Sequence, residues 1–184
     1  MGPAGREGQQ TMQAAEALAA LAEVSVAFAG FSGIVTAFRR HNPGDWDRLD
    51  RFRFRFMVEF SLATLALSLF PFFLSELGLP ESEVWSLSSL LLGGGALLYL
   101  VRSMLRLYPL VLAGEPVSKP LACVSIAVGV GITVSAFANA AGLSRHPSGV
   151  YLAGVGGCLF VSSAMFARLL LGSSPDTGSS GTTE

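Results

Sequence analysis

The chain has 184 residues, of which 51% are hydrophobic and only 14% charged, and its formal net charge is -1. A water-soluble domain with this composition would have too few polar residues to cover its surface. The near-zero net charge and the lack of a long basic tract exclude bulk attraction to nucleic acid, so we expect no nucleic-acid partner.

The charged residues gather in short clusters, and the apolar runs between them approach the ~20 residues that a helix needs to cross a bilayer. We therefore expect an all-α fold, a polytopic transmembrane helical bundle with the lipid bilayer around it. The five expected spans are residues 17–38, 57–78, 84–107, 121–142 and 149–171. A short extracytoplasmic tail, 1–16, precedes them, and a disordered tail rich in Ser, Gly and Thr, 172–184, follows.

The first expected span carries an acid, Glu23, on a helical face of small residues. That face also holds Glu16, Ala19, Ala20, Ala27, Gly30, Gly33 and Ala37. A carboxylate inside a bilayer is unfavourable, so we expect this face to turn inward and Glu23 to meet a polar partner, with Asn139 of the fourth span as the leading candidate. Glu23 is then either a proton or cation site or a structural acid that holds helices together.

The same span contains Gly30-Phe31-Ser32-Gly33, which has the GxSG shape of the rhomboid intramembrane proteases. In that family the serine works with a histidine from another helix. The two histidines, His41 and His146, fall in loops on opposite sides of the membrane, so neither can activate Ser32. We therefore interpret the match as coincidence and expect no enzyme, no metal site and no cofactor.

Residues 39–56 form a basic linker that we expect to be cytoplasmic and amphipathic, with Asn42-Pro43 as a helix start. Its basic segment consists of Arg48, Arg51, Arg53 and Arg55. One hypothesis is that these arginines bind anionic lipid headgroups, and the other is that they are a stop-transfer and orientation signal. Glu59 follows Arg55 by one helical turn, which predicts an ion pair at the interface.

The second expected span has hydroxyl side chains along one arc: Ser61, Thr64, Ser68 and Ser75, with Pro71 among them. Such a stripe either lines a polar pathway or lets helices approach closely. Pro71 should kink the helix rather than end it, because neighbouring helices can satisfy the freed carbonyl.

The remaining spans offer fewer signals. Trp85 and Tyr99 are expected to anchor the third span at the two interfaces. Cys123 and Cys158 lie in apolar runs, so we expect them to pack as small hydrophobic side chains.

Orientation follows from the basic residues, because ten of the twelve Lys and Arg residues fall on one side of five spans and only Arg6 and Arg145 on the other. The positive-inside rule then predicts an outside N-terminus and a cytoplasmic C-terminus.

Two stretches, Ala22 to Arg40 (AEVSVAFAGFSGIVTAFRR) and Arg53 to Leu62 (RFRFMVEFSL), resemble the opening of small bacterial membrane proteins of unknown function. The resemblance covers about the first third of the chain. It implies a bacterial inner (plasma) membrane protein and assigns no functional residue.

These patterns favour a non-enzymatic helical bundle that forms a homo-oligomer or serves as a membrane partner subunit. The alternative is a small transporter or channel that uses Glu23, Asn139 and the hydroxyls Ser61, Thr64 and Ser68.

Overall fold

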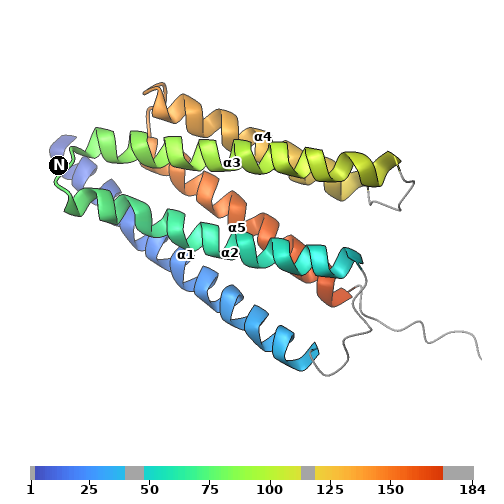
Figure 1. The fold of residues 1–184 in the computed structure, drawn as a ribbon. Coiled ribbons are helices and arrows are strands. Elements are labelled where there is room, and N and C mark those ends of the chain that lie inside the picture. Colours follow the sequence, from blue (N-terminus) through green and yellow to red (C-terminus); the bar gives the residue numbers. More distant parts are fainter. Residues whose placement is uncertain (1–2, 40–47, 113–118, 172–184) are drawn as a thin grey trace, which may run out of the picture.

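The computed structural model is a bundle of five α-helices (Figure 1), α1 (Pro3–Arg39), α2 (Arg48–Glu76), α3 (Glu81–Leu112), α4 (Lys119–Ala140) and α5 (Pro147–Leu171). The structure describes the backbone of residues 3–39, 48–112 and 119–171. Side chains are described within these ranges for residues 12–34, 54–105, 123–164 and 166–167.

Two glycines end helices at the sharp turns. Gly78 and Gly142 have φ angles of 76° and 74°, a left-handed conformation that glycine adopts without a steric penalty. After α4, the N–H of Gly142 bonds the carbonyl of Asn139 and the N–H of Leu143 bonds the carbonyl of Ala138, each at 3.0 Å. This pattern is a Schellman motif, which satisfies carbonyls that the helix end leaves free. The short connections turn α3 back along α2, and α5 back along α4.

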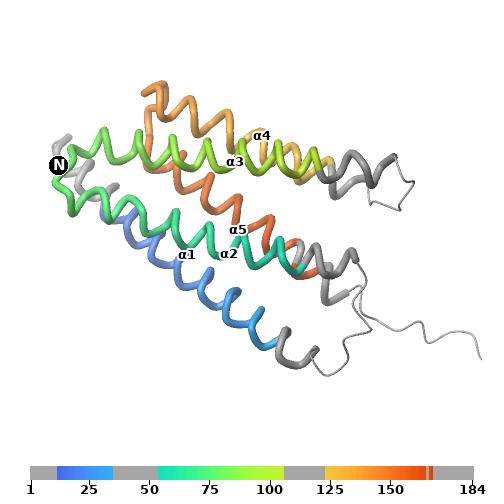
Figure 2. Tube along the Cα trace, in the orientation of Figure 1, coloured from blue at the N-terminus to red at the C-terminus, as the bar shows by residue number. Residues whose placement is uncertain are grey.

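α5 is the central helix of the bundle, because it contacts each of the other four helices. α1 packs against α2 and α5, whereas α3 pairs mainly with α4. Figure 2 shows the same division, with α1 and α2 on one side of α5 and the α3–α4 pair on the other. Within the described residues, the backbone of α1 does not come close to that of α3 or α4.

All five helices contain a segment long and apolar enough to cross a membrane within the described residues. These candidate spans are Met12–Ile34, Phe54–Glu76, Glu81–Leu105, Cys123–Ala140 and Pro147–Ala164. The expectation of an all-α bundle of five spans is therefore confirmed. The helices are longer than the spans: α1 starts at Pro3, and α2 starts at Arg48, so the second part of the basic linker continues into the second span as one helix.

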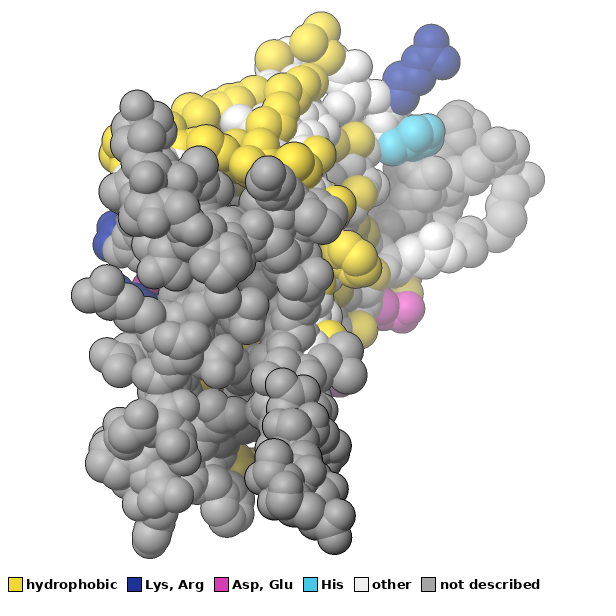
Figure 3. Space-filling model, turned by 90° about the vertical axis from the view of Figure 1, so that its right-hand side faces the viewer, with side chains coloured by type: hydrophobic (Ala, Val, Ile, Leu, Met, Phe, Trp, Pro, Cys, Tyr) yellow, Lys and Arg dark blue, Asp and Glu magenta, His cyan; other side chains and the backbone are white. Residues whose placement is uncertain are grey.

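The distribution of side chains is the reverse of that in a water-soluble protein. Ten polar residues of the described set are buried, and nine of them are serines or threonines, with at least one on each of the five helices. Large hydrophobic side chains are exposed on every helix, among them Phe73, Leu98, Val134 and Phe160. Figure 3 shows hydrophobic side chains gathered over the top of the bundle, where α3 and α4 lie. A surface of this kind is stable in lipid and unfavourable in water.

Candidate functional site

The hydroxyl stripe of α2 faces the interior, where Ser61, Thr64 and Ser68 are fully buried. Ser61 donates to the carbonyl of Met57 at 2.9 Å, and Thr64 donates to the carbonyl of Phe60 at 2.8 Å. Ser61 Oγ also lies 3.1 Å from Ser162 Oγ of α5, which joins the two helices. This arrangement fits close helix packing, because the bonded hydroxyls are satisfied within the protein.

Three buried polar atoms of the described residues have no hydrogen-bond partner: Ser68 Oγ, Ser88 Oγ and Asn139 Oδ1. They lie on three different helices, α2, α3 and α4.

Pro71 lies inside α2, and the helix continues through it as expected. Proline has no backbone N–H, so the carbonyl four residues earlier, that of Leu67, loses its helical partner. The Tyr151 hydroxyl of α5 donates a hydrogen bond of 2.6 Å to that carbonyl. The neighbouring helix therefore satisfies the group that the proline frees.

Asn139 joins the end of α4 to two other helices. Its Nδ2 atom donates to Ser89 Oγ of α3 at 2.7 Å and to the carbonyl of Pro147, the first residue of α5, at 2.9 Å. Ser86 of α3 adds a hydrogen bond of 2.8 Å to the carbonyl of Ala140, the last residue of α4. These contacts hold the turn between α4 and α5 against α3.

The expected pair of Glu23 with Asn139 is wrong. Asn139 is buried among α3, α4 and α5, whereas Glu23 is exposed on α1, which makes no contact with α4 in the described part of the chain. The face of α1 that turns inward carries Ala14, Leu18, Ala22, Ser25 and Ser32. This inward face contains alanines and serines as well as Leu18 but no charged residue, so packing it against α2 and α5 leaves both Glu16 and Glu23 outside.

The whole described part of the small-residue face is exposed, contrary to the expectation that it turns inward. We call it the α1 small face, and it comprises Glu16, Ala19, Ala20, Glu23, Ala27, Gly30 and Gly33. Ala37 lies outside the described side chains. A Cβ added at Gly30 or Gly33 would meet nothing within 4 Å. No other helix of this chain covers this face in the described structure.

At the start of the second span, the expected ion pair is confirmed. Arg55 Nε lies 2.7 Å from Glu59 Oε1, and both side chains are exposed. The side chains of Arg48, Arg51 and Arg53 and the expected helix start at Asn42-Pro43 lie outside what the structure describes.

Trp85 is not an interfacial anchor, because it is buried with 6% of its surface exposed. Its Nε1 donates to Glu81 at 3.3 Å, and its ring lies 6.0 Å from that of Tyr151. Tyr99 packs edge-on against Phe56 and Phe60 of α2, with ring centroids 5.0 and 4.5 Å away. Cys158 is buried in the core beside these helices, whereas Cys123 is exposed.

Sequence reasoning missed three residues that join neighbouring helices by hydrogen bonds: Tyr151, Ser162 and Ser89. Tyr151 is a tyrosine near the start of the last span, and together with a proline in another span it is a signal that could have indicated the first contact. The two serines lie in runs with several hydroxyls, so nothing in the sequence distinguishes them from their neighbours.

Among the described residues, no three His, Cys, Asp or Glu side chains come close enough to hold a metal ion together. The chain is a multi-pass helical membrane protein, as its five apolar helices and its apolar exterior define. Comparisons with protein-family models, with curated proteins and with solved structures find no match.

Proposed function

We propose that this protein is a non-enzymatic membrane bundle that assembles with a second copy of itself through the α1 small face. The observation that carries the proposal is the position of Glu23. It is exposed on the outside of the bundle and lies well inside the candidate span Met12–Ile34.

A carboxyl group in contact with lipid at this depth is unfavourable by about 3 kcal/mol on insertion scales. Among the described side chains, Arg55 lies on α2, Arg102 on α3 and Arg145 in the turn before α5, so none of these cations is on α1. A polar partner from outside the chain removes this penalty. Two carboxyl groups, one from each copy, can form hydrogen bonds with each other when at least one of them is protonated.

The neighbours of Glu23 suit such an interface. Ala19, Ala20, Ala27, Gly30 and Gly33 have little or no side chain, which lets the backbones of two helices approach closely. A two-fold axis beside α1 would bring the same face of both copies together, and two-fold dimers are the commonest oligomers. A second copy therefore supplies both the small surface and the carboxyl partner.

Transport has weaker support. It would require polar groups that converge on a pathway, and Glu23 and Asn139 lie on helices that do not touch within the described residues. Ser61 and Thr64 are bonded to their own helix.

Disulfide cross-linking in native membranes tests the assembly. In a Cys123→Ser background, which removes the exposed native thiol, Ala27→Cys should form a cross-linked dimer under mild oxidation. Leu98→Cys on α3, a position 70% exposed, should not. Glu23→Gln should keep the Ala27→Cys dimer because an amide still forms hydrogen bonds, whereas Glu23→Leu should reduce its yield. Equal yields at Ala27 and Leu98 would reject the interface, and an adduct of another mass would identify a different partner.

We also propose a bacterial inner-membrane location with the N-terminus outside and the C-terminus in the cytoplasm. The support is the placement of the basic residues. The C-terminal ends of α1, α3 and α5 and the starts of α2 and α4 lie at one end of the bundle (Figure 1), and ten of the twelve Lys and Arg residues belong to this end.

A further inference from the structure

A crevice separates the α3–α4 pair from α2 and α5. Its volume is about 460 Å³. α2, α3, α4 and α5 all contribute to its walls, and no residue of α1 lines it. Its lining is almost wholly apolar, with Phe60, Leu67, Leu92, Ile132 and Val161 among the side chains.

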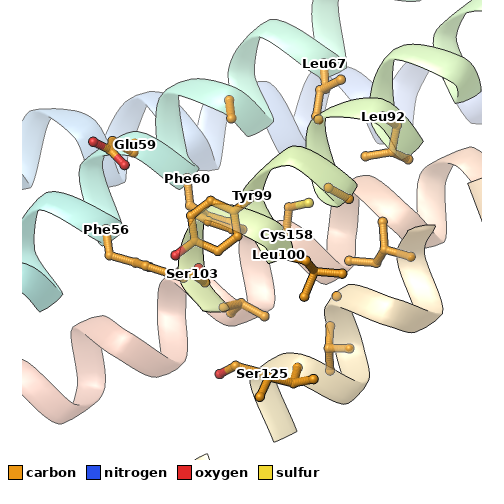
Figure 4. A pocket seen from close by; sticks show the side chains of 18 of the residues that line it. Phe56, Glu59, Phe60, Leu67, Leu92, Tyr99, Leu100, Ser103, Ser125 and Cys158 are labelled. Atoms are coloured by element: carbon orange, nitrogen blue, oxygen red, sulfur yellow. The ribbon is translucent and has the colours of Figure 1, made fainter. Parts of the chain in front are cut away.

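The polar groups of the crevice lie at one end. Figure 4 shows Phe56 and Glu59 at that end, and Leu67 and Leu92 at the other. Glu59 belongs to the first turns of the span Phe54–Glu76, about 8 Å from its start at the rise of an α-helix. The carboxylate of Glu59 is paired with Arg55, which lies one turn nearer to the membrane surface.

The crevice is open to the outside between α2 and α3. Ala63 and Ala66 of α2 and Leu91 and Gly95 of α3 line it and are also exposed. All four residues lie inside candidate spans, so the opening faces the hydrocarbon of the bilayer.

From this geometry we infer that the crevice binds one acyl chain of a membrane phospholipid, with the headgroup at the Arg55–Glu59 end. Water would find almost no hydrogen-bond partners on such walls. A methylene group takes about the volume of a water molecule in the liquid, ~30 Å³, so a volume of about 460 Å³ is of the size of one acyl chain. A helix ~10 Å across would fill the same volume with about one turn.

The charges at the rim favour a zwitterionic headgroup. Arg55 and Glu59 are both exposed, so a phosphate can approach the guanidinium while an ammonium approaches the carboxylate. Phosphatidylethanolamine carries both a phosphate and an ammonium. Phosphatidylglycerol has the phosphate alone and would leave Glu59 facing a net negative lipid.

Native mass spectrometry of the full chain in mild detergent tests the inference, with palmitoyl-oleoyl phosphatidylethanolamine as the probe. The wild-type protein should bind one lipid molecule more tightly than any additional lipid molecules. Gly95→Leu should bind it about tenfold or more weakly, because its side chain takes the place of several methylenes. A Cβ at Gly95 meets nothing within 4 Å, so the substitution fills the crevice without a clash at the backbone.

Gly94→Leu is the matched control. Gly94 is the adjacent residue, is exposed, has the same open space around it and does not line the crevice. Its lipid binding should equal that of wild type. Ala63→Leu on α2 is a second filling variant, which should reproduce the loss if Gly95→Leu does not fold.

Photo-cross-linking in vesicles needs no variant. Phosphatidylethanolamine with a diazirine in its acyl chain should label Phe60, Tyr99 or Leu100 of the crevice ahead of Leu98 and Leu105 on the outer side of α3. The acyl-chain site would be overturned if both sets of residues were labelled equally or if Gly95→Leu and Gly94→Leu bound lipid equally. It would also be overturned if the protein were a dimer that Gly95→Leu disrupts. Preference for phosphatidylglycerol would overturn the headgroup assignment.

Discussion

Tyr151 compensates for the backbone donor that Pro71 removes from α2. The tyrosine hydroxyl lies 2.6 Å from the carbonyl of Leu67, and the tyrosine itself is fully buried. Tyr151→Phe removes the donor and leaves a buried carbonyl without a partner. We expect it to lower the free energy of unfolding by about 1 kcal/mol, the usual range for hydrogen bonds between membrane helices.

A double-mutant cycle with Pro71→Ala isolates this contact. Alanine restores the N–H at position 71, which can bond the Leu67 carbonyl within the helix. In that background Tyr151→Phe should change the free energy of unfolding by no more than a few tenths of a kcal/mol. Unfolding in mixed detergent micelles measures all four variants. The same loss in both backgrounds would mean that Tyr151 acts through packing alone.

At the residue scale the sequence predicts pairs that are close along one helix and misses those between helices. The Arg55–Glu59 ion pair follows from a spacing of four residues. The partner of the Leu67 carbonyl and the contact of Ser61 with Ser162 depend on which helices are neighbours, which one sequence does not reveal. The predicted Glu23–Asn139 pair fails for the same reason.

Small residues determine how closely the helices approach, and α5 offers a matched pair of glycines. A Cβ at Gly154 would lie 2.6 Å from Leu92 Cδ2, so the end of the Leu92 side chain, which lines the crevice, would have to shift. A Cβ at Gly156 meets nothing within 4 Å. We expect Gly154→Ala to destabilise the bundle by about 1–2 kcal/mol through overpacking.

Gly156→Ala is the control for this substitution, because it makes the same change two residues away on the same helix. Its free energy of unfolding should stay within about 0.5 kcal/mol of wild type. Thermal unfolding of the purified variants, compared at one detergent concentration, gives the order of stability. If both substitutions destabilise equally, helix propensity rather than the contact with Leu92 is responsible.

At the scale of elements, the number and type of the helices follow from the sequence, since length and hydropathy are enough to predict apolar spans. The rotation of each helix about its axis does not follow. Both α1 and α2 have a face of small residues, yet the stripe of Ser61, Thr64 and Ser68 is buried and the α1 small face is exposed. A small-residue face can turn inward or outward in a membrane helix, and only the packing of all five helices selects between these two rotations.

For the whole molecule, an odd number of spans places the start of the first helix and the end of the last helix on opposite sides of the membrane. In Figure 1 the start of α1 and the end of α5 lie at opposite ends of the bundle, in agreement with five crossings. The α1 small face and the crevice are then sites within the bilayer. Both proposals therefore depend on this crossing number.

Reporter fusions at the two termini test the crossing number most directly. We expect a reporter fused after Gly172 to give a cytoplasmic signal and one fused ahead of Met1 to give an extracytoplasmic signal. Replacing Arg48, Arg51, Arg53 and Arg55 with Gln should produce mixed orientations, because these residues supply much of the charge asymmetry. Signals from the same side for both termini of the unaltered chain would contradict five membrane crossings.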